Sequence, residues 1–204
     1  MNSVTLKNIN QELEYIDPDE RRLIDTNIEE PLTIDDLINI LGYQFRDDMI
    51  LYSDLDKYQS IGQLLPRNNT FKIILIRDTP YSGHFVVILR YKKIIEWFDS
   101  YGFKPGDELD YMMVNNKLDQ TKSELINLLR DAQKKGFQIV YNNKDYQQYS
   151  TDYKTIAVCG RYCSLRIIML LKYNYDLEQF NNFMDDLRRR YKLNYDELVS
   201  LIIK

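Results

Sequence analysis

Histidine and cysteine are scarce in this sequence. Its 204 residues include one histidine, His84, and two cysteines, Cys159 and Cys163. The cysteines are four residues apart, which places both on one face of a helix and is not the framework of a disulfide-rich secreted domain. Any chemistry that needs a base near neutral pH must use His84 or a carboxylate or lysine whose pKa is strongly shifted.

Long apolar runs and an excess of basic residues are also absent. No stretch approaches the roughly 18 consecutive apolar residues of a membrane span, and residues 1–17 lack the basic start and apolar core of a signal peptide. The formal net charge is -4, whereas a general nucleic-acid binder needs a basic surface that neutralises phosphates. We therefore expect a soluble intracellular protein that binds neither membranes nor, in general, nucleic acid.

The composition predicts one domain. With 44% hydrophobic residues, the chain is long enough for one well-buried core but short for two, so we expect a single domain over residues 1–204. Within it, residues 1–32 are polar and carry breakers at 17–20 and 29–31, which predicts an irregular N-terminal arm. The 17 tyrosines are compatible with a groove, because tyrosine lines wet surfaces as readily as it packs inside.

Hydrophobic periodicity predicts an α+β fold. Helical spacing, caps and stop residues predict helices over 34–41, 58–65, 123–135, 160–171, 177–191 and 195–203. β-Branched and aromatic runs bounded by turn residues predict strands over 71–76, 84–91, 94–99 and 137–141. Only two residues separate the second and third strands, which makes them an antiparallel hairpin. We expect a mixed, mainly antiparallel central sheet flanked by helices, with 160–171 as a buried central helix.

Cys159 immediately precedes the predicted central helix. Unpaired backbone N–H groups and the positive end of the helix dipole favour a thiolate there, and cysteines at such positions have pKa values of roughly 3.5 to 7.5. Gly160 would let a substrate backbone approach closely, and the amide of Cys159 would face a developing oxyanion. The alternative is that Cys159 is simply a small buried hydrophobe, as most free cysteines are.

His84 and Asp99 form a second candidate pair. His84 begins one strand of the predicted hairpin and Asp99 ends the other, so the two residues are expected to be neighbours. Asp99 could then accept a hydrogen bond from the imidazole, fix its tautomer and stabilise its charged form. The alternatives are a surface histidine and an aspartate that caps the turn over 100–102.

Two glutamines, Gln147 and Gln148, lie in the polar loop that leads to Cys159. Either amide could donate a hydrogen bond to the oxyanion that forms during acyl transfer. The alternative is that a polar loop contains glutamines by chance. The residues alone leave the choice between the two open.

Four short motifs together resemble those of a known peptidase clan: GHFV at 83–86, WFDSYG at 97–102, QQ at 147–148 and CGRYC at 159–163. In the order His, Asp, Gln, Cys, and from about residue 33 to about 185, the chain resembles the adenovirus-type and SUMO-protease-type cysteine peptidases. Within that clan, the motifs and Arg166 in the following helix look most like capsid-maturation proteases of large double-stranded DNA viruses and virophages.

The resemblance implies roles for the site residues. His84 would be the general base, Asp99 its orienting acid, Cys159 the nucleophile, and one of the two glutamines the oxyanion donor. Gln147 follows an aromatic residue, as in the family pattern, whereas Gln148 is closer to the usual spacing from the cysteine. The chain departs from the family where Phe85 replaces a frequent tryptophan and where the loop before Cys159 is longer.

The resemblance also implies a substrate. Relatives cleave after a small residue, usually glycine, because the scissile strand threads a tunnel lined by aromatic side chains. We expect a monomeric endopeptidase without a cofactor or metal, acting on capsid or scaffold proteins in the virion and the host-cell cytoplasm. Adenovirus relatives are activated by a peptide and by DNA. A peptide activator stays open, and the acidic charge argues against DNA, for which 188–190 is the obvious basic patch.

Other functions are compatible with the same residues. A protease of this clan could instead remove ubiquitin-like modifiers, although the chain lacks the long N-terminal extension that such enzymes often carry. A noncatalytic interaction protein could keep the fold, but all four positions hold chemically competent residues. A zinc site is disfavoured, because Cys159, Cys163 and His84 give only three soft ligands without the usual spacing.

Overall fold

The structure is a computed structural model that describes residues 16–80, 82–107, 109, 120, 122–151 and 153–204. By its internal contacts the chain divides into two compact units. Unit 1 comprises Met1–Gln44 and Tyr146–Lys204, and unit 2 comprises Phe45–Asp145. The expectation of a single domain stays a prediction, because this division alone does not test it.

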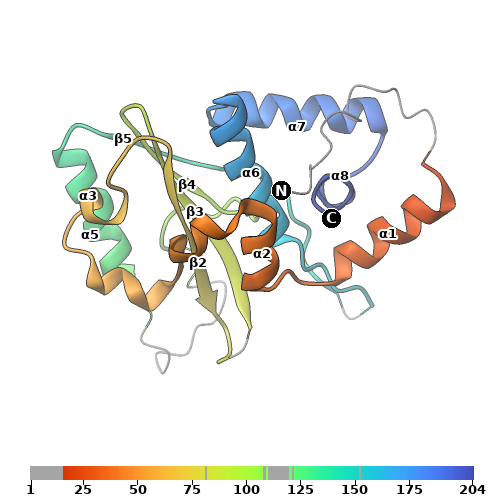
Figure 1. Ribbon diagram of the computed structural model, residues 1–204, viewed down its shortest axis with the longest axis horizontal. Coiled ribbons are helices and arrows are strands. Elements are labelled where there is room, and N and C mark those ends of the chain that lie inside the picture. The colour runs from red at the N-terminus through yellow and green to blue at the C-terminus, as the bar shows by residue number, and fades with distance from the viewer. Residues whose placement is uncertain (1–15, 81, 108, 110–119, 121, 152) are drawn as a thin grey trace. The chain divides into compact units, whose positions relative to one another are not determined.

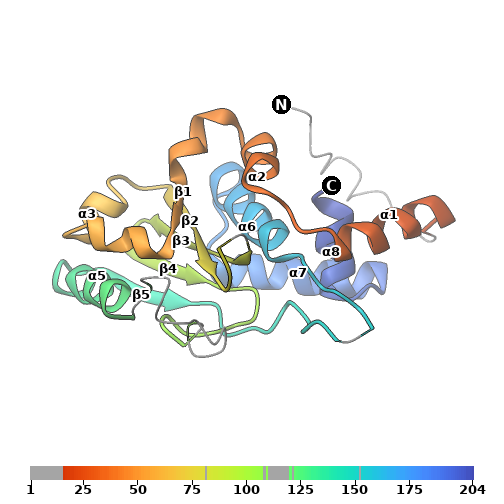
Figure 2. The ribbon, with the colours of Figure 1, turned by 90° about the horizontal axis from the view of Figure 1, so that it is seen from below.

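Unit 2 is built on a five-stranded mixed sheet in the order β1-β2-β3-β4-β5 (Figures 1 and 2). The strands are β1 (Met49–Leu51), β2 (Thr70–Arg77), β3 (Gly83–Tyr91), β4 (Ile94–Phe98) and β5 (Gln138–Tyr141). The three central strands pair antiparallel, and the two edge strands pair parallel to their neighbours. The predicted α+β class, the mixed sheet and the antiparallel hairpin are confirmed.

One face of the sheet carries the core of unit 2. Alternate residues of the central strands point to this face, which α3 (Ile61–Leu64) and α5 (Lys122–Lys134) cover (Figure 1). The buried apolar side chains that meet there include Ile74, Ile76, Val86, Ile88, Ile95, Trp97, Leu125 and Leu128. Burial of this set fixes the register of β3 and β4, since a slip by one residue would turn the apolar side chains to the opposite face.

Unit 1 is helical. Its helices are α1 (Pro18–Glu29), α2 (Ile34–Leu41), α6 (Cys159–Tyr173), α7 (Leu177–Tyr191) and α8 (Tyr195–Ile202). Helix α8 packs against α1, α6 and α7, and α2 packs against α6 (Figure 2). Every residue of α6 from Gly160 to Leu170 is buried, which confirms the predicted buried helix with Cys159 at its N-terminus.

The expected irregular arm is wrong for residues 18–29, which form α1. Asp17 caps this helix by accepting hydrogen bonds from the backbone N–H groups of Asp19 and Glu20 at 2.9 and 2.8 Å. Pro18 occupies the first helical turn, where its missing N–H costs nothing. These residues start a helix, although they were interpreted as breakers. Residues 1–15 of the expected arm lie outside the described residues.

Smaller differences concern short elements. The helix expected over 58–65 is limited to Ile61–Leu64, and two 3-10 helices, Tyr43–Asp48 and Tyr52–Lys57, precede it. Strand β1 was not predicted, because three residues are too few to show an alternating pattern. Within the described part of the chain, no helix combines the length and apolar character needed to cross a bilayer.

Candidate functional site

His84 and Asp99 are hydrogen-bonded in unit 2. His84 is the second residue of β3 and Asp99 directly follows β4, so the hairpin brings the two side chains together. His84 Nε2 lies 2.9 Å from Asp99 Oδ1. His84 is 4% exposed and Asp99 is fully buried. The pairing expected from the hairpin is therefore present.

The pair defines the tautomer of the imidazole. The same oxygen, Asp99 Oδ1, also accepts a hydrogen bond from the backbone N–H of Tyr101 at 2.8 Å. A carboxylate oxygen that accepts from a backbone amide is an acceptor for the imidazole as well, so Nε2 is the nitrogen that donates. In the neutral ring Nδ1 is then the basic nitrogen, the one that can take a proton from a thiol.

The turn after β4 holds Asp99 in place. Gly102 N donates to the Asp99 carbonyl at 2.9 Å, and Asn142 Nδ2 donates to the same carbonyl at 2.8 Å. Gly102 has φ of +76°, and a side chain there would lie about 3.0 Å from the Lys144 backbone, so glycine is required. Sequence reasoning missed Asn142, because nothing in its local pattern indicates a partner 43 residues away.

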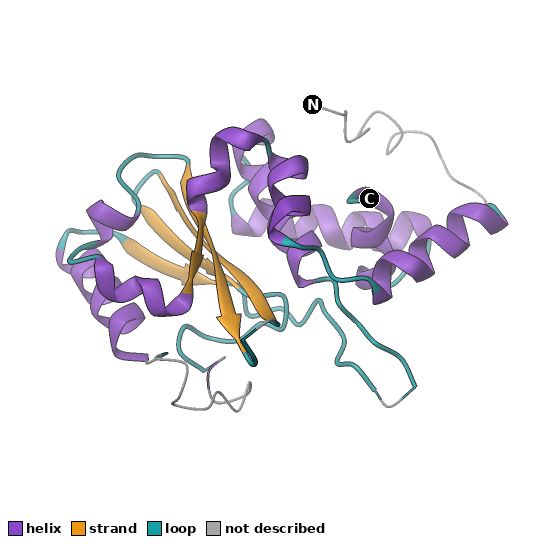
Figure 3. Ribbon diagram, turned by 60° about the horizontal axis from the view of Figure 1, so that its bottom comes forward, coloured by secondary structure: helices purple, strands orange, loops and turns teal. Residues whose placement is uncertain are grey.

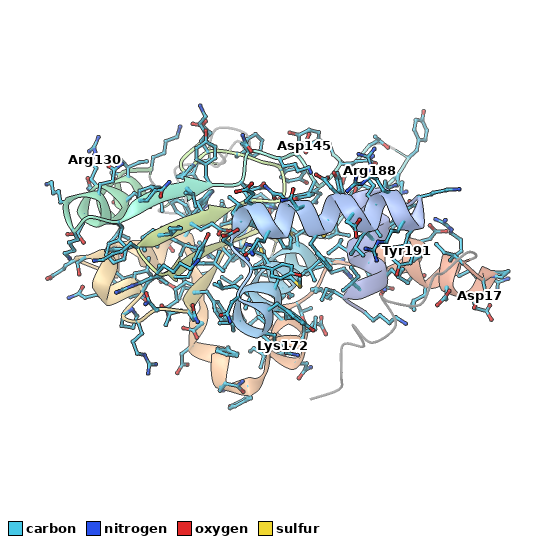
Figure 4. All side chains as sticks on the ribbon, turned by 90° about the horizontal axis from the view of Figure 1, so that it is seen from above. Asp17, Arg130, Asp145, Lys172, Arg188 and Tyr191 are labelled. Atoms are coloured by element: carbon cyan, nitrogen blue, oxygen red, sulfur yellow. The ribbon has the colours of Figure 1, made fainter. Side chains whose placement is uncertain are left out.

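Two neighbours add to the environment of the pair. The Tyr101 ring lies against the imidazole with 4.9 Å between centroids. Burial and then the negative charge of Asp99 raise the pKa of Asp145, which Figure 4 labels. The Tyr101 ring and the Asp145 carboxyl group thus both belong to the surroundings of the pair.

Gly83 sets the position of His84 by allowing two backbones to approach. A Cβ atom at Gly83 would lie 2.1 Å from the carbonyl oxygen of Ile76 on β2. No side chain fits in that space, so the strand can begin next to His84 only with glycine. In the sequence, Gly83 stands out only as the first residue of the GHFV motif, and nothing there indicates this close contact.

Cys159 is the first residue of α6 in unit 1. The preceding residue, Val158, gives the helix no side-chain cap. Cys159 is partly exposed, whereas Cys163, one turn later, is fully buried. The start of a helix favours a thiolate through the aligned peptide dipoles, so Cys159 has both the position and the access that a nucleophile needs.

Gly160 does not have the role expected for it. A Cβ atom there would lie 3.3 Å from Leu32 Cβ and 3.4 Å from Leu37 Cδ2. The residue is buried against the segment around α2, so its small size serves packing of α6 and not the approach of a substrate backbone. The expectation was wrong because sequence does not reveal which face of the first turn is covered.

Arg161 places a buried positive charge two residues after Cys159. Its guanidinium donates to three neutral oxygens, which are Oδ1 of Asn27 and the carbonyl oxygens of Glu30 and Ile203. Burial lowers the pKa of Arg161, and the negative charges of Glu30, Asp36 and Cys159 act in the opposite direction. In the sequence, Arg161 stands out only as part of the CGRYC motif, which gives no sign of these contacts.

The structure distinguishes the two glutamines. They lie in the long connection from β5 to α6, which runs mostly as loop (Figure 3). Gln147 is 2% exposed, and its Nε2 donates to the carbonyl of Ile156 at 3.2 Å. The Gln148 residue is exposed, and its backbone N–H donates to Asp196 Oδ2 at 3.1 Å. A fixed, buried amide makes Gln147 the better candidate for an oxyanion donor.

The candidate residues are divided between the units. Unit 2 brings His84 and Asp99 together, and unit 1 contains Cys159, Gln147 and Gln148. Among the residues that the structure describes, no three His, Cys, Asp or Glu side chains converge as metal ligands would. The roles that the sequence predicts for the five residues stay predictions.

Comparison with known proteins finds a similarity to a virophage protein. The chain is 30% identical over 156 residues to a protein of Sputnik virophage named uncharacterized protein V9. The aligned region covers 76% of this chain and 85% of the virophage protein. No family model matches the sequence.

Proposed function

Since the chain belongs to the family of the Sputnik virophage protein V9, we propose a viral function for it, as a cysteine endopeptidase. The observation that carries the proposal is the hydrogen bond of 2.9 Å between His84 Nε2 and Asp99 Oδ1, made by two buried side chains. A buried imidazole oriented by a carboxylate through Nε2 presents Nδ1 as a base, which is what a thiol nucleophile needs. Cys159 at the start of α6 supports the same reading.

The acylation step follows from these roles. The thiol proton of Cys159 passes to His84 Nδ1, and the resulting thiolate attacks the carbonyl carbon of the scissile bond. The carbonyl oxygen becomes an oxyanion that accepts from Gln147 Nε2–H and the Cys159 backbone N–H. The imidazolium then gives its proton to the amine, the C–N bond breaks and a thioester remains.

Deacylation uses the same base. His84 Nδ1 takes a proton from water as the water oxygen attacks the thioester carbon, and the oxyanion again accepts from Gln147 and the Cys159 amide. The C–S bond breaks, the Cys159 thiolate recovers the proton from the imidazolium, and a carboxylic acid product leaves. Asp99 accepts a hydrogen bond from His84 Nε2–H in both half-reactions and stabilises each imidazolium.

The proposed substrates are capsid or scaffold proteins, cleaved after a small residue such as glycine during virion maturation. The motifs around His84, Asp99 and Cys159 support this substrate class by resemblance, and the virophage relative supports the viral setting. Removal of ubiquitin-like modifiers uses the same chemistry. The test of the proposal must therefore compare capsid proteins with modifier fusions as substrates.

The purified protein should be incubated separately with the capsid protein of its own virus and with modifier fusions that end in glycine. We expect cleavage of the capsid protein, nearly complete loss of activity in His84→Ala, and a smaller loss in Asp99→Asn, which keeps a hydrogen-bonding group but not its charge. If the protein cleaves the modifier fusions in preference, ubiquitin-like modifiers replace capsid proteins as the proposed substrates. A largely active His84→Ala variant would contradict the mechanism, because the chain has no second imidazole.

The chemistry also requires that His84 Nδ1 and Cys159 Sγ come within hydrogen-bonding reach. This can be tested without a substrate, by the pH dependence of Cys159 alkylation. An imidazolium beside the thiolate extends rapid alkylation to lower pH. We expect that extension in the wild type and its loss in His84→Ala, and identical profiles would show that the two residues do not act together.

A further inference from the structure

Asp196 is buried beside the loop that contains the candidate oxyanion donor, and the catalytic scheme does not use it. We propose that Asp196 is a positioning residue that holds Gln147 in the orientation needed to bind the oxyanion. The inference rests on the proposed function and names a residue that neither the motifs nor the hairpin geometry indicate. All the contacts concerned lie within unit 1.

Both carboxylate oxygens of Asp196 receive a hydrogen bond. Asp196 is the second residue of α8 and is 1% exposed. Its Oδ1 accepts from the hydroxyl of Tyr162 on α6 at 2.9 Å, and its Oδ2 accepts from the backbone N–H of Gln148 at 3.1 Å. Hydrogen bonds to a buried carboxylate are stronger than those between neutral groups, so Asp196 ties the loop firmly to two helices.

The residue before Gln147 is held as well. The Tyr146 ring stacks on Tyr162 with 5.7 Å between centroids and meets the edge of Tyr195 at 4.9 Å. Its hydroxyl donates to Asn181 Oδ1 at 2.6 Å. Both sequence neighbours of Gln147 are therefore fixed: Tyr146 by its aromatic contacts, and Gln148 by the hydrogen bond from its backbone N–H to Asp196.

The protonation states suit this arrangement. Burial and then the charge and hydrogen bond of Asp196 raise the pKa of Tyr162 well above its ordinary value. The phenol therefore stays a neutral donor at physiological pH. An ionised carboxylate is an acceptor at both oxygens, whereas an asparagine would offer an NH₂ group to one of the two donors.

A fixed backbone at Gln147 matters because an oxyanion hole works by preorganisation. The bond from Gln147 Nε2 to the Ile156 carbonyl, at 3.2 Å, orients the amide only while the loop that carries it is fixed. A donor displaced by even about 1 Å loses most of its effect on the transition state while substrate binding changes little. Loosening the anchor should thus lower kcat and leave KM nearly unchanged.

The test uses Asp196→Asn, which preserves volume, and Asp186→Asn on α7 as a half-buried control outside the loop contacts. We expect kcat of Asp196→Asn to fall by about 10-fold or more with KM unchanged, and the control to keep its activity. In the Gln147→Ala background the same Asp196→Asn change should have almost no further effect, because both act through one donor. Unchanged kcat or fully additive effects would overturn the inference.

Two further measurements separate this inference from the proposed function. Hydrogen exchange of the Gln148 amide should accelerate in Asp196→Asn, while the alkylation rate of Cys159 should not change. Neither readout requires proteolysis, so a wild-type protein that cleaves nothing would count against the proposed function alone. An unchanged exchange rate would show that Asp196 does not anchor the loop and would overturn the inference. Thermal melting of each variant checks that it is folded.

Discussion

At the scale of single residues, burial and charge oppose each other at His84. An imidazole that is 4% exposed is costly to protonate, yet the proposed chemistry requires an imidazolium in both half-reactions. The carboxylate of Asp99, at 2.9 Å, is what makes the charged form tolerable. The position of Asp99 is therefore important, and hydrogen bonds from Tyr101, Gly102 and Asn142 fix it.

The two cysteines should differ sharply in reactivity. Cys159 is partly exposed at a helix start beside Arg161, and Cys163 is fully buried within the same helix. We expect iodoacetamide to modify Cys159 much faster than Cys163, as peptide mapping of briefly labelled protein would show. Cys163→Ser serves as the control and should label at the wild-type rate. Faster labelling of Cys163 would show that Cys159 is not the nucleophile.

Cys159→Ala should separate reactivity from packing. Because Cys159 is only partly buried, its loss should leave the fold and the melting temperature nearly unchanged. Cleavage should be abolished, because alanine offers no nucleophile.

The two glutamines offer a matched pair of variants. Gln147 is buried with its amide bonded to Ile156, whereas Gln148 is exposed and is held through its backbone. We expect Gln147→Ala to lower single-turnover rates by roughly 10²- to 10³-fold with little change in substrate binding, and Gln148→Ala to have a small effect. If neither variant slows the chemical step, another group donates to the oxyanion.

At the scale of elements, sequence patterns were most reliable where local chemistry decides the structure. The helices expected over 34–41 and 177–191 are found with the same bounds, because each combines an N-cap with a clear apolar face. The hairpin and its His84–Asp99 pair followed from a two-residue connection between strands. Helix α1 was missed because Pro18 was interpreted as a breaker, although proline also favours the first helical turn.

The supporting residues of the site could not have been found in this way. Asn142, Arg161 and Asp196 each act through hydrogen bonds to partners that are 34 to 134 residues distant in the sequence. Polar side chains of these types are common on protein surfaces, and no periodic pattern distinguishes the few that are buried and bonded. Sequence therefore predicted the candidate reactive groups but not the shell that orients them.

Close packing of β2 and β3 makes Gly83 sensitive to substitution. A Cβ atom at Gly83 would lie 2.1 Å from the Ile76 carbonyl oxygen, so Gly83→Ala must displace one strand. We expect a loss of roughly 1–3 kcal/mol of unfolding free energy or more, measured by denaturant titration, together with reduced cleavage because His84 is adjacent. The matched control is Gly62→Ala in α3, where the nearest atom is 3.9 Å away.

The control should behave in the opposite way. Gly62 lies within a helix, and a methyl group there makes only an ordinary van der Waals contact with Ser60 Oγ at 3.9 Å. Alanine should therefore stabilise the protein by about 0.5–1 kcal/mol. Equal effects of the two substitutions would mean that the approach of β2 to Gly83 is not as close as the structure describes.

At the scale of the whole molecule, the charge distribution bears on regulation. The net charge is -4, and the densest basic run lies at the end of α7, where Figure 4 labels Arg188. Arg190 pairs with Asp186 at 2.6 Å and Arg189 approaches the same carboxylate at 3.8 Å. The Arg188 guanidinium lies 5.1 Å from the centre of the Tyr195 ring. The run is therefore partly neutralised by its own helix.

A protein with this distribution should not depend on DNA for activity. Strong binding to duplex DNA requires several Lys or Arg contacts to phosphates, and log Kd then changes steeply with log salt, by about 0.9 per phosphate contacted. We expect duplex DNA at about 0.15 M salt to leave the cleavage rate of a peptide substrate unchanged, and the triple substitution of 188–190 by alanine to change neither rate nor salt dependence. The opposite result would be a cleavage rate that rises with DNA, falls again with added salt, and no longer responds to DNA in the triple variant. That result would make the end of α7 a regulatory site despite the negative charge of the whole chain.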